Sequence, residues 1–134
     1  MTRAKVQHVE PDPVAATELL AQARSHLESA RLDGIDSQSA YGIAYQAALK
    51  AMVATLLADG LRVGSGAGGH VVTIQRAGEH LDLDPAVASR VDHMRRTRHR
   101  VFYDGDEVSE LELEGALTDA DAVVAAAAEA VDRA

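Results

Sequence analysis

The chain has 134 residues, no cysteine and a formal net charge of −8. This length predicts a single domain with a core of its own, and the lack of cysteine excludes disulfides, thiolate metal sites and a cysteine nucleophile. The acidic balance argues against a protein that coats nucleic acid by general electrostatic attraction, so a nucleic-acid role would need a local basic surface.

The N-terminal part of the chain carries no targeting signal. It lacks the apolar stretch of a signal peptide, and no apolar run in the chain approaches the length of a membrane span. We therefore expect a cytoplasmic protein that does not enter a membrane. Residues 1–11 show no periodicity, so we expect a flexible N-terminal tail there and a single domain over residues 12–134.

Two long helices are expected in the first half of the chain. Asp12 followed by Pro13 is typical of a helix start, with aspartate as the N-cap, and the apolar face that follows extends to about Leu32. A second helix, over about residues 37–59, is rich in alanine and apolar on nearly all sides. Such a helix is expected at the centre of a bundle, where small side chains let its neighbours approach closely.

Residues 64–69 are rich in glycine and have the spacing Gly-x-Gly-x-x-Gly. A dinucleotide-binding loop with this spacing follows a strand, whereas here a helix is expected before it. A flexible connector is the favoured interpretation, and a loop that cradles a phosphate is the alternative. A short helix is expected to follow over residues 70–81.

Two more long helices are expected in the second half. Asp84 followed by Pro85 predicts a helix that ends near Asp104, and Ser109 with Glu112 forms a capping box that opens the last helix. No stretch shows convincing strand alternation. The sequence therefore predicts an all-α, antiparallel up-and-down bundle of four long helices and one short helix.

The expected fourth helix concentrates positive charge. Five of the thirteen Lys and Arg residues lie between residues 90 and 104: Arg90, Arg95, Arg96, Arg98 and Arg100. Val87, Val91, Met94 and Val101 follow the spacing of an apolar helix seam, and Arg98 occupies the position missing from that series. An arginine at such a position is expected either to contact a partner subunit or to be buried within one subunit.

Candidate chemistry concentrates in the same stretch. The six histidines show no metal-binding spacing, so no metal or cofactor is expected. Arg98 can bind a phosphate through its planar fork, and the neighbouring His99 can move a proton near neutral pH. Together they could form a metal-free site that cleaves phosphodiesters, while Arg95, Arg96 and Arg100 are candidate nucleic-acid or anion-binding residues. The alternative is an arginine that bonds helix-end carbonyls or an acid and holds helices or subunits in register.

Three segments resemble the HEPN domain, in particular its small free-standing prokaryotic branch. They are the run Ala-Tyr-Gln-Ala-Ala-Leu-Lys-Ala over residues 44–51, His70 with the two valines that follow it, and the run from Arg98 to Asp104. The likeness covers about residues 13–131 and implies a helical bundle.

The resemblance also assigns site residues. The family signature is an arginine, a polar residue, a few further positions and then a histidine; Arg98 and His99 match its start, and Tyr103 stands where the closing histidine is expected. Tyrosine is a poor base at neutral pH because its unperturbed pKa is about 10. The degenerate Arg-x4-Tyr signature therefore implies little or no catalysis. His99 can replace the histidine only if it faces the same cleft, since adjacent helix positions differ by about 100°.

The resemblance implies partners as well: a homodimer formed through the face that carries the signature, and a nucleotidyltransferase antitoxin. Three functions stay open from the sequence. The first is a homodimeric toxin–antitoxin-type or regulatory module with little or no catalysis. The second is a metal-independent endoribonuclease, a toxin that uses Arg98 with His99 or Tyr103 at the dimer interface, and the third is a helical interaction protein without a nucleic-acid role.

Overall fold

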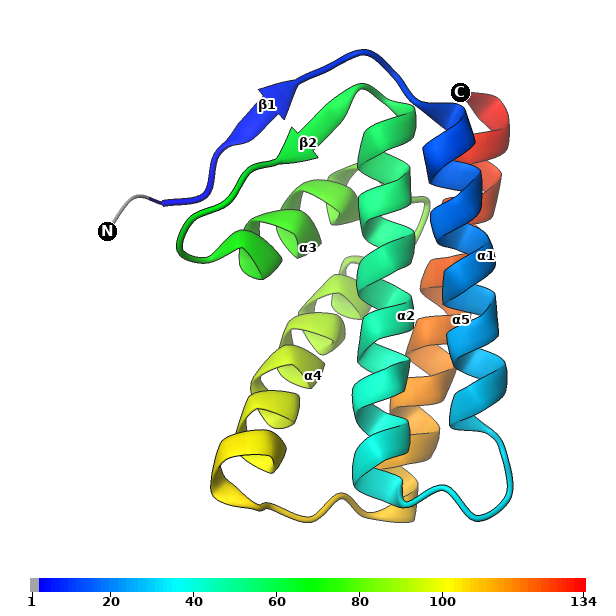
Figure 1. Cartoon of the computed structure of the whole chain (residues 1–134), viewed down its shortest axis with the longest axis vertical. Helices are drawn as coiled ribbons and strands as arrows, with labels where there is room; N and C mark the ends of the chain where they lie inside the picture. The colour runs from blue at the N-terminus through cyan, green and yellow to red at the C-terminus, as the bar shows by residue number, and fades with distance from the viewer. Residues whose placement is uncertain (1–2) are drawn as a thin grey trace.

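The computed structural model describes residues 3–134, which form five helices and one two-stranded sheet (Figure 1). In chain order the elements are β1 (Val6–His8), α1 (Pro13–Ala30), α2 (Ser37–Ala58), β2 (Leu61–Val63), α3 (Gly69–His80), α4 (Pro85–Asp104) and α5 (Glu110–Arg133). The predicted all-α bundle of four long helices and one short helix is confirmed. The small sheet is an addition that the sequence did not indicate.

Side-chain caps determine where the long helices begin. The carboxylates of Asp12, Asp36 and Asp84 each accept a hydrogen bond from a backbone N–H in the first turn of the following helix. Ser109 and Glu112 form the reciprocal bonds of a capping box at the start of α5. These bonds satisfy N–H groups that have no partner within the helix, so the four starts are locally encoded.

Helix α2 lies at the centre of the molecule and packs against each of the other four helices. Figure 1 shows α1, α2 and α5 running alongside one another, while α3 and α4 lie on the other side of α2. The core side chains of α2 alternate between large residues such as Met52 and Leu56 and alanines that are fully buried. Small side chains permit close contact between helices, which explains how one helix can have so many neighbours.

Helix α2 is the one helix in the described part of the chain that is long and apolar enough to cross a membrane, so the expectation that no apolar run approaches this length is wrong. Of the apolar window that meets this criterion, 67% is buried inside the protein. Its apolar character is therefore accounted for by its place in the core.

The N-terminal segment is hydrogen-bonded to the chain that follows α2. Strand β1 pairs antiparallel with β2, with Val6 opposite Val63, and the bonds from Ala4 N–H to Ala67 and from Val9 N–H to Gly60 extend the contact. This arrangement differs from the flexible tail expected for residues 1–11, of which residues 1 and 2 lie outside the described range. Strands of three residues are too short to produce a visible alternation in the sequence.

Substitutions at two glycines test the contact between the N-terminal segment and the chain that follows α2. Gly34 and Gly60 both have positive φ, at +88° and +74°. A Cβ at Gly60 would lie 2.7 Å from the carbonyl oxygen of Val9, whereas a Cβ at Gly34 would meet nothing within 4 Å. We expect Gly34→Ala to lower the free energy of unfolding by about 1–2 kcal/mol, the cost of a left-handed backbone. In urea denaturation, Gly60→Ala should lower the free energy of unfolding by more than Gly34→Ala does. Equal losses in the two variants would contradict the position of Val9 against Gly60.

Candidate functional site

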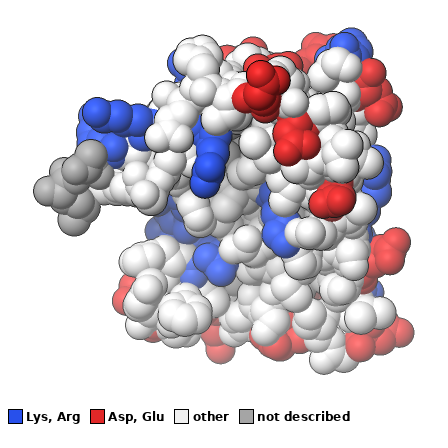
Figure 2. Space-filling model, turned by 45° about the horizontal axis from the view of Figure 1, so that its top comes forward, with Lys and Arg blue, Asp and Glu red and all other residues white. Residues whose placement is uncertain are grey.

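The main cleft of the protein lies between α2, α3 and α4 and has a volume of about 510 Å³. Its polar and aromatic lining comes from all three helices: Tyr45, His70, Arg95, Arg98, His99, Phe102 and Tyr103. On the face seen in Figure 2, Lys and Arg side chains lie at the left and in the recessed middle, whereas acidic side chains lie over the upper part and along the right and lower edges. The cleft therefore joins a hollow shape to local positive charge in an acidic protein.

Arg98 lies beside the apolar seam of α4, and Thr97, which is 5% exposed, occupies the seam in its place. The guanidinium carbon of Arg98 lies 5.7 Å from the centre of the Tyr45 ring, a cation–π geometry. A Cβ at Gly42 would lie 3.6 Å from Arg98 Nε, so the arginine runs close along α2. Among residues 3–134, no acidic side chain lies within salt-bridge distance of Arg98. Its charge is therefore available to a ligand.

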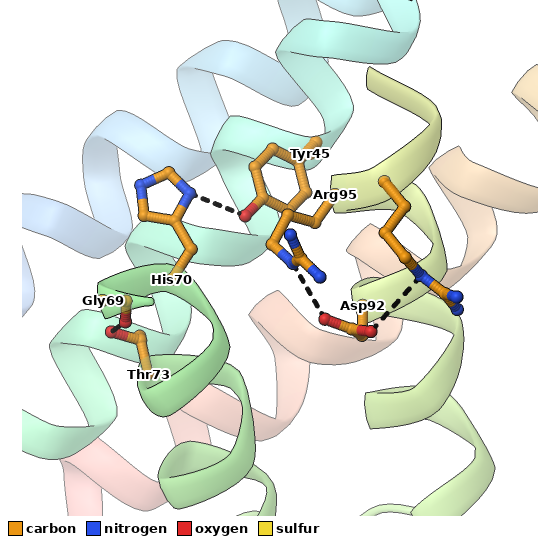
Figure 3. A network of polar contacts seen from close by, with 7 residues as sticks. Tyr45, Gly69, His70, Thr73, Asp92 and Arg95 are labelled. Carbon is orange, nitrogen blue, oxygen red and sulfur yellow. Dashed lines mark hydrogen bonds and ion pairs between the residues drawn. The ribbon is translucent and has the colours of Figure 1, made fainter. Parts of the chain in front are cut away.

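Tyr45 connects the core to the cleft. It is 0% exposed, yet its hydroxyl lies 2.9 Å from Nδ1 of His70, which stands at the start of α3 (Figure 3). Burial raises the pKa of Tyr45 to about 12, with smaller opposing contributions from Arg95 and Arg98. The phenol is therefore protonated at physiological pH.

His70 has a lowered pKa. Burial disfavours its charged form most, and the positive charges of Arg98 and Arg95 disfavour it further. The imidazole is therefore neutral around pH 7, and the positive charges near it belong to Arg95 and Arg98. A neutral histidine in a positively charged cleft can donate or accept one hydrogen bond without changing the charge of the site.

Arg95 is the one predicted anion-binding arginine that lines the cleft. Its Nε lies 2.9 Å from one oxygen of Asp92, and Nε of Arg96 lies 3.5 Å from the other, so one carboxylate stands between two guanidinium groups (Figure 3). Arg96 does not line the cleft, and Arg100 turns away from it to pair with Asp106 at 3.6 Å. Arg96 and Arg100 lie outside this cleft because successive helix positions face different directions, and their anion-binding role stays a prediction.

His99 and Tyr103 lie on the α4 side of the cleft with Arg98. Their ring centroids are 4.4 Å apart, and Phe102 meets Tyr103 edge-on with centroids 5.0 Å apart. Phe102 and Tyr103 are 77% and 69% exposed. The three residues of the predicted signature therefore share one cleft, and an exposed aromatic surface lies next to it.

The glycine-rich loop ends at the same cleft. Gly68 is the N-cap of α3 with φ +75° and no side-chain capping bond, and both Gly68 and Gly69 line the cleft. The partial positive charge of a helix N-terminus thus lies beside the arginines. Among residues 3–134, no three His, Cys, Asp or Glu side chains are grouped to hold a metal ion.

Reasoning from the sequence did not include Tyr45 and His70 among the site residues. They are separated by 25 positions in the chain, and only the packing of α3 on α2 brings them together. The one available signal was that both fall in segments that resemble the HEPN domain.

The family model of the HEPN domain matches residues 16–131, nearly the whole chain. No curated protein matches the chain.

The pKa of His70 provides a test of the cleft. We expect an NMR titration to place it below 6.5, the ordinary value. Replacing Arg98 by methionine should raise it, because a nearby positive charge opposes protonation and its removal favours the charged imidazolium. Arg100→Met, outside the cleft, serves as the control and should leave the titration unchanged. An unshifted His70 in Arg98→Met would show that the arginine does not face the imidazole.

Proposed function

We infer a function from one established premise: the chain belongs to the HEPN domain family. We propose that it is a cytoplasmic, homodimeric HEPN protein that binds RNA in the cleft between α2, α3 and α4. It acts as a toxin–antitoxin-type or regulatory module, with a nucleotidyltransferase antitoxin as its partner, and has little or no catalytic activity. The observation that carries this proposal is the Arg98 guanidinium, which lies in the cleft without an acidic partner among the described residues.

The charge pattern supports RNA as the ligand. A guanidinium group matches the geometry of a phosphate, and Arg98 is held in place by the Tyr45 ring. Arg95 adds positive charge that Asp92, which is shared with Arg96, offsets only in part. Because the protein carries a net charge of −8, general electrostatic attraction does not favour RNA, and binding requires a local basic site such as this cleft.

Exposed apolar side chains beside the cleft support the homodimer. Phe102 and Tyr103 end α4, and Leu111, which is 78% exposed, stands near the start of α5. Aromatic side chains exposed together are typical of protein interfaces. A second subunit that covers this surface would lie next to Arg98 and would extend the cleft.

The proposed low catalytic activity rests on Tyr103, which stands where the family signature has a histidine. Histidine there could take a proton from a ribose 2′-hydroxyl near neutral pH, and tyrosine lacks that ability.

One observation nevertheless favours a metal-independent endoribonuclease as a second candidate. His99 stacks on Tyr103 at 4.4 Å and lines the same cleft as Arg98, so a base and a phosphate-binding group are near one another.

Binding of RNA tests the proposal. Fluorescence anisotropy of a labelled single-stranded oligoribonucleotide, in EDTA and low salt, should show binding by the wild type. We expect Arg98→Ala to weaken it at least about ten-fold, the effect of losing a charge-assisted hydrogen bond. Arg100→Ala removes an equal charge from the same helix but from outside the cleft, and it should weaken binding by no more than about two-fold.

The same samples separate binding from cleavage. Electrophoresis of the RNA after incubation should show intact oligonucleotide. Cleavage that persists in EDTA and disappears in Arg98→Ala and His99→Ala would establish the endoribonuclease instead. Equal affinities of the Arg98 and Arg100 variants, or no binding by the wild type, would contradict the proposed RNA site.

The oligomeric state tests the interface. Light scattering coupled to size exclusion should give a dimer for the wild type, and Leu111→Ser should shift the mass toward the monomer because it removes exposed apolar area outside the cleft. Leu32, at 64% exposure just beyond α1, offers a matched control, and Leu32→Ser should remain dimeric. A wild-type monomer at high micromolar concentration would refute the homodimer.

A further inference from the structure

His70 presents two different environments to its two ring nitrogens. Nδ1 contacts the hydroxyl of Tyr45, which is 0% exposed. The residue itself is exposed and lines the cleft with Arg98 and Arg95, so the other edge of the ring is open to a ligand. Nδ1 is therefore committed to the core, whereas Nε2, on the side of the exposed ring away from Tyr45, is accessible to a ligand (Figure 3).

The buried hydroxyl determines which nitrogen carries the hydrogen. Among residues 3–134, Tyr45 has no hydrogen-bond partner other than His70, and at 0% exposure it cannot donate to bulk water. A buried hydroxyl hydrogen without an acceptor is unfavourable, so the hydroxyl donates to Nδ1 of His70. A neutral imidazole has one hydrogen, which then lies on Nε2.

The charged groups around His70 favour this neutral donor. Tyr45 faces it from α2, and Arg95, Arg98, His99 and Tyr103 line the same cleft from α4. Asp92, an acidic group on α4, is bonded to Arg95. Burial and the two arginine charges keep the imidazole uncharged near pH 7. Its Nε2–H group is therefore a neutral hydrogen-bond donor in a cleft that two guanidinium groups also line.

We propose that His70 is a phosphate-binding residue: its Nε2–H group, oriented by the Tyr45 hydroxyl, donates to a phosphodiester oxygen of RNA that the Arg98 guanidinium binds from the neighbouring helix. This rests on the proposed binding of RNA. Tyr45 acts through His70 and is a positioning residue. The start of α3 adds the partial positive charge of a helix N-terminus to the same position.

With His70 and Arg98 in the same cleft, the proposed phosphate site lies entirely within one protomer. The family signature lies entirely on α4, and a site made from that helix alone would depend on a second subunit. His70 on α3 supplies a second group that meets Arg98 in a cleft of the same chain. RNA binding should therefore persist in a monomeric Leu111→Ser variant, because Leu111 does not line the cleft.

Two substitutions of His70 distinguish its nitrogens. The amide of asparagine can replace Nδ1 as the acceptor for Tyr45 but does not reach the position of Nε2, whereas the amide of glutamine reaches further. We expect His70→Asn to weaken binding of the labelled oligoribonucleotide at least about five-fold, and His70→Gln to bind more tightly than His70→Asn. His93→Asn, on α4 outside the cleft, is the control and should bind as the wild type does.

The outcomes separate this inference from the proposed function. If the wild type does not bind the oligoribonucleotide, the proposed function fails, and this inference fails with it. If the wild type binds and Arg98→Ala does not, while His70→Asn equals the wild type, the role of His70 is overturned and RNA binding stands. Glutamine no better than asparagine would overturn the assignment of the donor to Nε2.

A direct measurement does not depend on the folding of any variant. Long-range ¹H–¹⁵N NMR of the wild-type histidine rings should show the Nε2–H tautomer for His70, and addition of the oligoribonucleotide should shift its Nε2 resonance. In Tyr45→Phe the preference for this tautomer should weaken. A dominant Nδ1–H tautomer in the wild type, or an Nε2 resonance that the oligoribonucleotide leaves in place, would overturn the proposal.

Discussion

The close packing of four helices on the alanine-rich surface of α2 is the constraint on which the rest of the structure depends. Fully buried alanines along this helix let its neighbours approach, and large side chains such as Met52 and Leu56 fill the space between them. This packing holds α3 and α4 on one side of α2, where they form the cleft. A larger residue in place of these alanines would separate the helices and change the cleft as well as the core.

Tyr45 links this packing to the candidate chemistry. It is a large residue on a helix dominated by alanine, its ring lies under Arg98, and its hydroxyl reaches His70. One fully buried side chain thus positions a cation from α4 and an imidazole from α3. The geometry of the cleft is therefore tied to the stability of the core, because neither group can move without disturbing its contact with Tyr45.

The parts of the fold that were predictable from the sequence are those encoded locally. Asp12, Asp84 and the pair Ser109 and Glu112 cap helices where their spacing indicated, and the alanine-rich helix is central as its composition predicted. The strands were missed because each has three residues, which is too few for a periodic pattern. The helix seam was misassigned at Arg98 because Thr97, a polar residue that completes the seam, was not counted as a core position.

The candidate site follows the same division between local and long-range information. Arg98, His99 and Tyr103 are close in sequence on one helix, so their placement in one cleft could be anticipated, and their catalytic roles stay predictions. The contact between Tyr45 and His70 joins two helices across a packed interface, and no spacing rule encodes it.

The central claim is that RNA binds in the cleft of this HEPN protein through Arg98 and His70. It is tested most directly by NMR mapping of a short oligoribonucleotide on the isotopically labelled protein. The account predicts that the largest shifts fall on the Arg98 side-chain Nε–H, the His70 ring and the first turn of α3, while the α1 and α5 surfaces stay unchanged. Shifts centred on any other surface, or no shifts at concentrations that saturate a weak site, would contradict it.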